Sequence, residues 1–152
     1  MNKLPFEIKR EIFVKKNSNT NLEYGCKPEE RKIEELINYG IVNINKPAGP
    51  TSHQVSDYVK KILDIKRSGH SGTLDPNVTG VLAIALDRAT RIVQTLLKAG
   101  KEYVGVMHLH KEISENDLVK GTNKFKGVIE QLPPVRSAVK RQLRKREIYY
   151  FD

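Results

Sequence analysis

The order of apolar and polar residues predicts three core elements in the first two thirds of the chain. Residues 80–86, GVLAIAL, form a short unbroken apolar run, which is typical of a buried strand. Residues 41–45, IVNIN, predict a second short strand by the same reasoning. Between them, residues 52–65 carry apolar side chains at i, i+4, i+7 and i+8, so we expect a helix with one apolar face. These side chains are Val55, Val59, Ile62 and Leu63.

The flanking segments predict further elements separated by turn residues. Residues 1–28 are polar and rich in Asn, and we expect an irregular arm that becomes ordered on another surface. Pro28 suits a first helical position, so we expect a helix from there to a C-terminal stop at Gly40. Beyond the core elements, the pattern predicts a helix at 89–99, a strand at 101–110, a short helix at 113–124, and strands at 126–131 and 147–151.

The charge balance indicates a phosphate-rich partner. The 152 residues include 27 Lys and Arg against 18 Asp and Glu, a formal net charge of +9. Such an excess favours nucleic acid because binding releases counterions, although a basic protein without such a partner is the alternative. The single cysteine, Cys26, has no disulfide or metal-ligand partner and fits a reducing compartment. With no membrane span and no secretory signal in the pattern, we expect a cytoplasmic protein.

One acidic residue stands out within this basic chain. Asp75 lies in the stretch GHSGTLDP, between a turn rich in Gly, Ser and Thr and the proline Pro76. Gly69 and Gly72 allow backbone angles that other residues avoid, and Pro76 fixes its own φ, so the loop presents one side chain in a fixed direction. Two interpretations remain at this point: a carboxylate that performs chemistry, or an Asx-type turn in which Asp75 accepts hydrogen bonds from nearby backbone N–H groups.

Five short motifs resemble a known family when they are taken together. They are KPAGPTS at 46–52, GHSGTLDPNVTGVL at 69–82, DRATR at 87–91, KEY at 101–103 and QLPPVRSAVKR at 131–141. Their order resembles the TruB/dyskerin family of RNA pseudouridine synthases. The resemblance implies an α+β fold, in which a mixed, largely antiparallel sheet carries helices on its faces, here as an incomplete catalytic domain.

The resemblance also implies a reaction without a cofactor or a metal, in which a uridine of RNA becomes pseudouridine. The N-glycosidic bond breaks, the uracil turns, and C5 bonds to C1′. The aspartate of the GTLDP motif, here Asp75, is the family's essential carboxylate. A carboxylate can attack a sugar or base carbon, or it can stabilise a developing cation and move a proton, and the sequence leaves these roles open.

Other site residues follow from the same resemblance. Tyr103 matches a tyrosine that stacks on the target base, and His70 matches a motif histidine beside the displaced nucleotide. The alternatives are a core-facing strand residue for Tyr103 and a loop hydrogen-bonding residue for His70. The residues expected to support the active-site loop are Lys46, Pro47, Gly49, Gly72, Thr73, Leu74 and Pro76. For Lys46, the alternative is a solvated surface lysine.

A cluster of cations follows the double proline near the C-terminus, and we expect it to contact RNA phosphates. An exposed strand face without RNA is the alternative. The cluster consists of Arg136, Lys140, Arg141, Arg144, Lys145 and Arg146. Arg88 and Arg91 are weaker candidates for the same surface.

Three features favour the archaeal, dyskerin-like branch, which is guided by box H/ACA RNA and works with small accessory proteins. They are the long segment before residue 38, the stretch LLKAGKEYVGVMHLH and the stretch SAVKRQLRKREIYY. We therefore expect an arm and helix at 1–37 and the first part of the catalytic domain at 38–152. The target would be rRNA, or tRNA in a stand-alone enzyme.

The resemblance covers only part of what the family carries. An arginine that pairs with the catalytic aspartate and a PUA domain are expected beyond these 152 residues. A non-catalytic RNA-binding fragment or scaffold subunit is therefore an alternative to an enzyme. A carboxylate-dependent glycosidase is a third, although it would need a second acid at a set distance.

Overall fold

The computed structural model describes residues 7–19, 21, 23–135 and 140–151. These residues form two compact units, one of residues 13–99 and one that joins the N-terminal residues to residues 100–152. Each unit is described separately below. In both, helices accompany antiparallel strands, as the α+β fold class predicted.

A three-stranded antiparallel sheet is the centre of the first unit. Its strand order is β1 (Ile41–Lys46), β3 (Gly80–Leu86), β2 (Ser68–His70). The apolar run of β3 is explained by this central place, because β1 and β2 pair with its two edges and Leu82, Ile84, Ala85 and Leu86 are buried, whereas Val81 near its start is exposed. β1 and β3 are the strands that the apolar pattern predicted, whereas β2 was not predicted.

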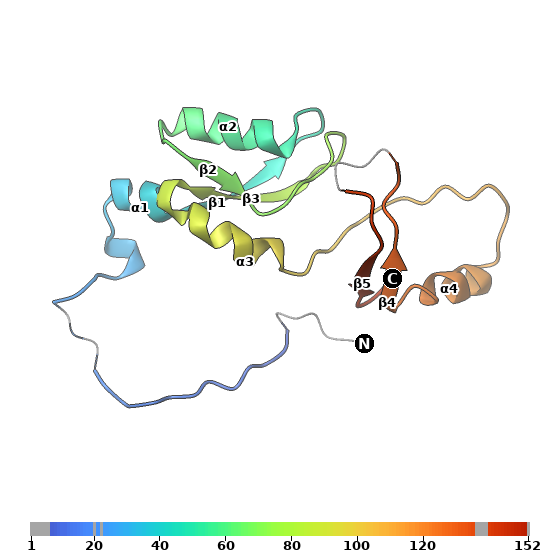
Figure 1. The fold of residues 1–152 in the computed structure, drawn as a ribbon, viewed down its shortest axis with the longest axis horizontal. Helices are drawn as coiled ribbons and strands as arrows, with labels where there is room; N and C mark the ends of the chain where they lie inside the picture. The colour runs from blue at the N-terminus through green and yellow to red at the C-terminus, as the bar shows by residue number, and fades with distance from the viewer. Residues whose placement is uncertain (1–6, 20, 22, 136–139, 152) are drawn as a thin grey trace. The chain divides into compact units, whose positions relative to one another are not determined.

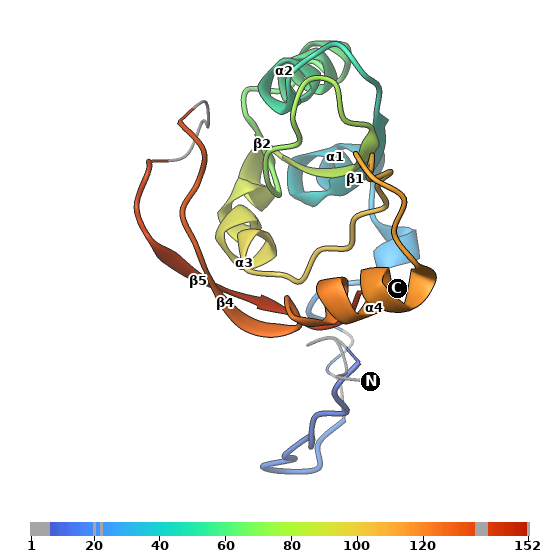
Figure 2. The same ribbon diagram turned by 90° about the vertical axis from the view of Figure 1, so that its right-hand side faces the viewer.

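Helix α2 (Ser52–Ile62) covers one face of this sheet, and α1 (Ile33–Tyr39) and α3 (Val93–Leu97) lie on the other (Figures 1 and 2). α2 begins with a capping box: the Thr51 hydroxyl accepts the N–H of Gln54, and the Gln54 side chain accepts the N–H of Thr51. The reciprocal bonds satisfy two backbone donors and fix where the helix starts.

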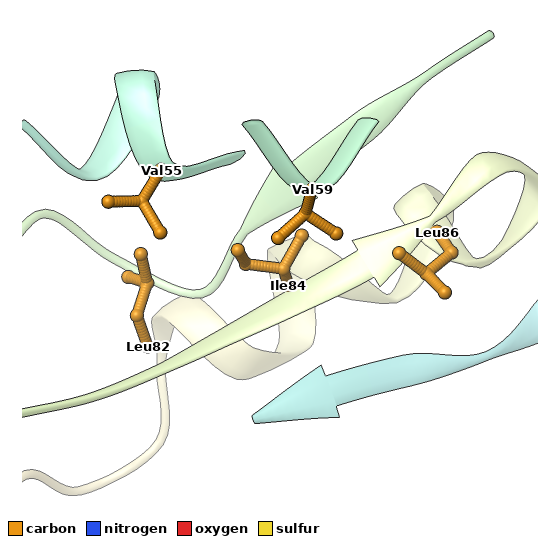
Figure 3. Close-up of a cluster of buried hydrophobic side chains, with 5 residues drawn as sticks. All are labelled: Val55, Val59, Leu82, Ile84 and Leu86. Atoms are coloured by element: carbon orange, nitrogen blue, oxygen red, sulfur yellow. The ribbon is translucent and has the colours of Figure 1, made fainter. Parts of the chain in front are cut away.

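The core lies between α2 and β3. Val55 and Val59 project from the apolar face of α2 onto Leu82, Ile84 and Leu86, which alternate along β3 (Figure 3). The helical spacing of the first pair and the period of two in the strand both bring these side chains to one interface. Partly buried side chains at its margin include Leu74, from the loop before β3.

Two glycines of the first unit are required for different reasons. Gly72 has φ of +152°, a backbone angle that only glycine adopts readily, as predicted. Gly69 instead lies in β2, outside the positive-φ residues, where an added Cβ would come within 3.2 Å of Val93. The prediction of unusual backbone angles was therefore wrong for Gly69, which is small because the helical layer packs closely against it.

Helices around the core are more broken than the sequence predicted. The helix expected after Pro28 is divided into a 3₁₀ turn η1 (Pro28–Glu30) and α1, because Arg31 and Lys32 have extended backbones. The helix expected at 89–99 begins as the 3₁₀ helix η2 (Asp87–Ile92) and continues as α3.

The second unit contains α4 (Glu115–Asn123) and an antiparallel pair, β4 (Gly127–Gln131) and β5 (Arg144–Ile148). The helix at 113–124 and the strand at 126–131 are thus confirmed. The last strand starts and ends earlier than the predicted 147–151, because its register with β4 is complete at Ile148.

The strand predicted at 101–110 does not form. This segment is irregular, and Val104 and Val106 are 99% and 103% exposed. Its alternating pattern is that of a strand, but no strand of the described residues pairs with it. A strand needs a hydrogen-bonding neighbour, and periodicity alone does not supply one.

Candidate active site

Two loops lie together at one end of the three-stranded sheet. β1 ends at Lys46 and β3 begins at Gly80, and these residues are directly paired in antiparallel register. The loop that follows β1 (residues 47–51) and the loop that precedes β3 (residues 71–79) therefore leave the sheet side by side. The second of these loops carries Asp75.

Lys46 ties the two loops together from inside the fold. Lys46 is fully buried, and its Nζ donates to the carbonyl oxygens of Pro47 (2.8 Å), Pro76 (3.0 Å) and Val78 (3.0 Å). An ammonium group has three donors, and all three are used here, which is the condition for burying such a charge. A solvated surface lysine, the alternative for Lys46, is excluded.

Two more contacts fix the backbone on either side of Asp75. The N–H of Gly49 donates to the Pro76 carbonyl at 2.8 Å, and Gly49 has φ of +112°. On the other side, the hydroxyl of Ser52 accepts the N–H of Leu74 (2.9 Å) and donates to its carbonyl (3.1 Å). The loop therefore holds its shape at the residues directly before and after the carboxylate.

The carboxylate of Asp75 itself has no partner among the described residues. Asp75 is exposed, and within the described residues no hydrogen bond or ion pair reaches its side chain. Its backbone carbonyl accepts the N–H of Val78 at 3.0 Å. An Asx-type turn would need a backbone N–H bonded to the carboxylate, so this alternative finds no support in the described part of the chain.

His70 lies at the start of the same loop, at the last position of β2. Its Nδ1 is 2.8 Å from the carbonyl oxygen of Gly72. Because a carbonyl only accepts, Nδ1 carries the hydrogen of this bond. The bond closes the turn at Gly72, and the N–H of Ser71 continues the pairing with β3 by donating to Ala83 at 2.9 Å.

The remaining loop residues differ in exposure. Thr73 and Pro76 are exposed, whereas the Leu74 side chain is partly buried and packs against the core. Pro47 is also exposed and contributes its carbonyl to Lys46. The structure thus places the residues expected to support the site on the two adjacent loops, and their role in the site stays a prediction.

Tyr103 lies in the second compact unit, on the irregular segment at 100–110. Its side chain is 72% exposed, so the core-facing alternative does not hold in this structure. A role for Tyr103 beside Asp75 stays a prediction.

The cationic cluster near the C-terminus divides over two faces of the β4–β5 pair. Arg144 and Arg146 are opposite Gln131 and Ile129, so they share one face. Lys145 points to the other face, opposite Glu130. Lys140 and Arg141 are exposed before β5, and Arg136 lies outside the described residues. The alternation along β5 therefore places both arginines on one face; Arg146 is exposed there, whereas Arg144 is half-buried and its Nη2 donates to the Lys140 carbonyl at 3.3 Å.

Arg88 is engaged away from the Asp75 loop. Its Nη1 donates to the Tyr39 hydroxyl at 2.8 Å, and its guanidinium lies 5.7 Å from the centre of that ring. The pair joins η2 to α1. Arg91 is exposed on η2.

The described residues contain no group of three His, Cys, Asp or Glu side chains that could hold a metal ion. Within the same residues, no helix is long and apolar enough to cross a bilayer.

Comparison with known families identifies the chain. The model of the TruB family pseudouridylate synthase (N terminal domain) matches residues 60–149, which include the Asp75 loop. The chain belongs to this family. A second model, the DKCLD (NUC011) domain, matches residues 1–56 and thus includes the loop that Lys46 begins.

Archaeal relatives extend the likeness over nearly the whole chain. "Probable tRNA pseudouridine synthase B" of Methanopyrus kandleri is 55% identical over 150 residues, which cover 99% of this chain and 44% of that protein. The protein of the same name from Pyrococcus furiosus is 53% identical, again over 44% of its length. The chain therefore spans less than half the length of these relatives.

Solved structures agree with the sequence relatives. A chain in "Crystal Structure of a Cbf5-Nop10-Gar1 Complex" matches with a TM-score of 0.91 and 53% identity, over 98% of this chain and 46% of that one. A chain in "Structure of H/ACA RNP bound to a substrate RNA containing 2'-deoxyuridine" matches with a TM-score of 0.85 and 48% identity, over 97% and 44%. Membership of the dyskerin-like branch of the family is thus confirmed.

Ser52 belongs to the KPAGPTS motif, but it was not among the residues expected to form the candidate site. In the structure, Thr51 caps helix α2, and the Ser52 hydroxyl forms hydrogen bonds with the backbone of Leu74. The available signal was the Thr-Ser pair itself, since one cap leaves the second hydroxyl without a partner.

Proposed function

We propose that this protein isomerises uridine to pseudouridine in RNA and that Asp75 supplies the essential carboxylate. One observation carries the proposal: the backbone around Asp75 is held by Ser52, Gly49 and Lys46, while the carboxylate is exposed and accepts no bond from the described residues. A side chain fixed at its base and open at its tip is suited to contact a substrate. Membership of the pseudouridylate synthase family supports the same reaction.

The reaction needs no oxidant or reductant, because it exchanges one bond for another. The bond from C1′ to N1 breaks, the bond from C1′ to C5 forms, and the hydrogen of C5 is replaced by one at N1. Asp75 either attacks a carbon of the nucleotide or stabilises charge at C1′ and carries the proton. Either role requires that the base leave its stack, which unpaired RNA allows at least cost.

His70 and Tyr103 are proposed to contact the nucleotide. His70 is in the turn that presents Asp75, and the bond from its Nδ1 to Gly72 holds the ring in place. Tyr103 offers an exposed ring on which a displaced uracil can stack. The support residues Lys46, Pro47, Gly49, Gly72, Thr73, Leu74 and Pro76 are proposed to act through the shape of the two loops.

The RNA partner is proposed to be a box H/ACA guide RNA paired with an rRNA target, with small accessory proteins bound to the complex. The likeness to chains in a Cbf5-Nop10-Gar1 complex and in an H/ACA RNP supports this. A role in rRNA processing and ribosome biogenesis, in the cytoplasm, follows from the same proposal. A tRNA target is the second candidate, and the names of the archaeal relatives favour it.

The proposed division of the chain follows from the same likeness. Residues 38–152 would be the first part of the catalytic domain, and residues 1–37 an arm and helix that precede it. The two family models cover residues 1–56 and 60–149, so they meet inside α2 and not at residue 37.

The test is turnover of RNA whose target uridine carries tritium at C5, with the protein at its native length and with guide RNA and accessory proteins. We expect Asp75→Asn to abolish tritium release while RNA affinity at fixed salt stays near wild type. Asp64→Asn is the matched control, because Asp64 is also exposed in the first unit and loses the same charge. Retained turnover in Asp75→Asn would remove Asp75 from catalysis.

The same assay separates the candidate targets. Release from an rRNA target that depends on the guide supports the RNA-guided enzyme. Release from a tRNA without any guide supports the second candidate. Specific binding without release from either RNA would support a non-catalytic subunit.

A further inference from the structure

Ser52 is a fully buried polar residue whose single oxygen atom makes two hydrogen bonds. It is the first residue of α2, directly after the capping residue Thr51. The hydroxyl accepts the N–H of Leu74 at 2.9 Å and donates to the carbonyl of the same residue at 3.1 Å. Helix α2 does not need these bonds for its own start, because Thr51 and Gln54 already form the capping box.

Ser52 holds the peptide unit between Leu74 and Asp75. The carbonyl of Leu74 and the N–H of Asp75 belong to one planar peptide, so a bond to this carbonyl fixes the plane on the N-terminal side of Asp75. The Leu74 side chain packs against the core and holds the same residue from its other end. Leu74 is therefore attached both to the helix and to the core.

The peptide that leaves Asp75 is held separately. The carbonyl of Asp75 accepts the N–H of Val78 at 3.0 Å, and the ring of Pro76 fixes the next φ angle. With both flanking peptides hydrogen-bonded, the backbone angles of Asp75 are set, and only the side-chain torsions of the carboxylate remain free. Lys46 and Gly49 hold the part of the loop that follows.

We infer that Ser52 is a positioning residue for the Asp75 carboxylate, which it orients through the Leu74 peptide. This inference rests on the proposed isomerisation at Asp75 and assigns to the helix a part in that reaction. Displacement of a catalytic group by about 1 Å can lower a rate by about a hundredfold. Loss of the Ser52 hydroxyl should therefore lower kcat far more than it lowers RNA affinity.

Ser56 provides a matched control on the same helix. It is 4% exposed, and its hydroxyl donates to the Ser68 hydroxyl at 2.9 Å, which joins α2 to β2. Ser52→Ala and Ser56→Ala each remove one buried hydroxyl from the inner face of α2. They differ in that only the Ser52 hydroxyl bonds to the Asp75 loop among the contacts described.

The experiment compares the two variants at native length, with guide RNA and accessory proteins, in three measurements. We expect Ser52→Ala to lower kcat about 10- to 100-fold with RNA affinity within about twofold of wild type. We expect Ser56→Ala to keep kcat near wild type. The third measurement is hydrogen exchange of the Val78 amide, which bonds to Asp75 and not to Ser52. Its exchange should accelerate in Ser52→Ala and stay unchanged in Ser56→Ala.

Three outcomes would overturn the inference. Equal losses of kcat in the two variants would mean that the hydroxyls only stabilise α2. Unchanged kcat and unchanged Val78 exchange in Ser52→Ala would mean that the loop keeps its shape without Ser52. A third outcome is that the wild type releases no tritium, while Val78 exchange is still faster in Ser52→Ala. This outcome would reject the proposed isomerisation, and with it the catalytic role of this contact.

Discussion

Lys46 offers a direct test of how the candidate site is built. We consider Lys46→Met, which keeps most of the apolar length of the side chain and removes the ammonium group. The Pro76 carbonyl keeps the N–H of Gly49, so the change strands the carbonyl oxygens of Pro47 and Val78. Both bonds are partly buried and come from a charged donor. A hydrogen bond to a charged group contributes about 1.5–3 kcal/mol, so the loss of two costs about 4 kcal/mol.

Part of this loss is recovered, because the variant no longer buries a charge, and burial of a charge has its own cost. We therefore expect Lys46→Met to lower the free energy of unfolding by about 3 kcal/mol. For a chain of this size each kcal/mol changes Tm by about 2–4 °C, so the melting temperature should fall by about 6–12 °C.

The assay is thermal unfolding followed by circular dichroism in the absence of RNA. Lys66→Met is the control, because Lys66 is an exposed lysine of the same unit and the variant loses the same charge. Surface changes of this kind usually alter stability by less than about 0.5 kcal/mol. A melting temperature for Lys46→Met within about 2 °C of the control corresponds to a loss of stability on the order of 1 kcal/mol or less. Such a result would refute the argument that the ammonium joins the two loops.

Two further predictions concern charge. Lys60 and Lys61 donate hydrogen bonds to Asp57 and lower its pKa from 3.8 to about 2. NMR titration of the Asp57 carboxyl carbon should show the lowered pKa. In the double variant Lys60→Met/Lys61→Met, the pKa of Asp57 should return to near 3.8. Since the folded-state pKa lies below the unfolded value, the stabilisation is complete above about pH 4 and fades as the pH falls toward 2; acid unfolding unchanged in Asp57→Asn would contradict this. On the β4–β5 pair, Arg146→Gln should reduce the slope of the salt dependence of RNA binding by about one unit. Lys145→Gln should change this slope less, because Lys145 lies on the face that carries Glu130. Equal slopes for the two variants would mean that strand alternation does not select the phosphate-binding face.

Local pattern was sufficient for the elements that form the core. The apolar run of β3 and the helical spacing of Val55 and Val59 each depend on residues close in sequence, and both were predicted. The motif around Asp75 likewise lies within a few residues, so the sequence by itself identified the family and the candidate carboxylate. Such features follow from backbone periodicity and turn chemistry, which neighbouring residues determine.

Tertiary structure decided which polar groups are buried and what they hold. Pairing of Lys46 with Gly80 brings together two loops about 30 residues apart, and this contact buries the Lys46 ammonium against three acceptors, where the sequence had left a solvated surface lysine as the alternative. The same juxtaposition brings the Ser52 hydroxyl to Leu74 in the Asp75 loop. Long-range register depends on how strands pair, and the sequence near each residue carries little of that information.

The strand predicted at 101–110 illustrates the same limit from the other side. Its alternating side chains satisfy the period of a strand, yet Val104 and Val106 remain exposed because no described strand pairs with them. A helix satisfies its backbone hydrogen bonds within one segment, whereas a strand requires a second segment to satisfy them. The sequence therefore determined the core elements and the candidate carboxylate, and the tertiary structure determined the contacts that hold the backbone of Asp75 in place.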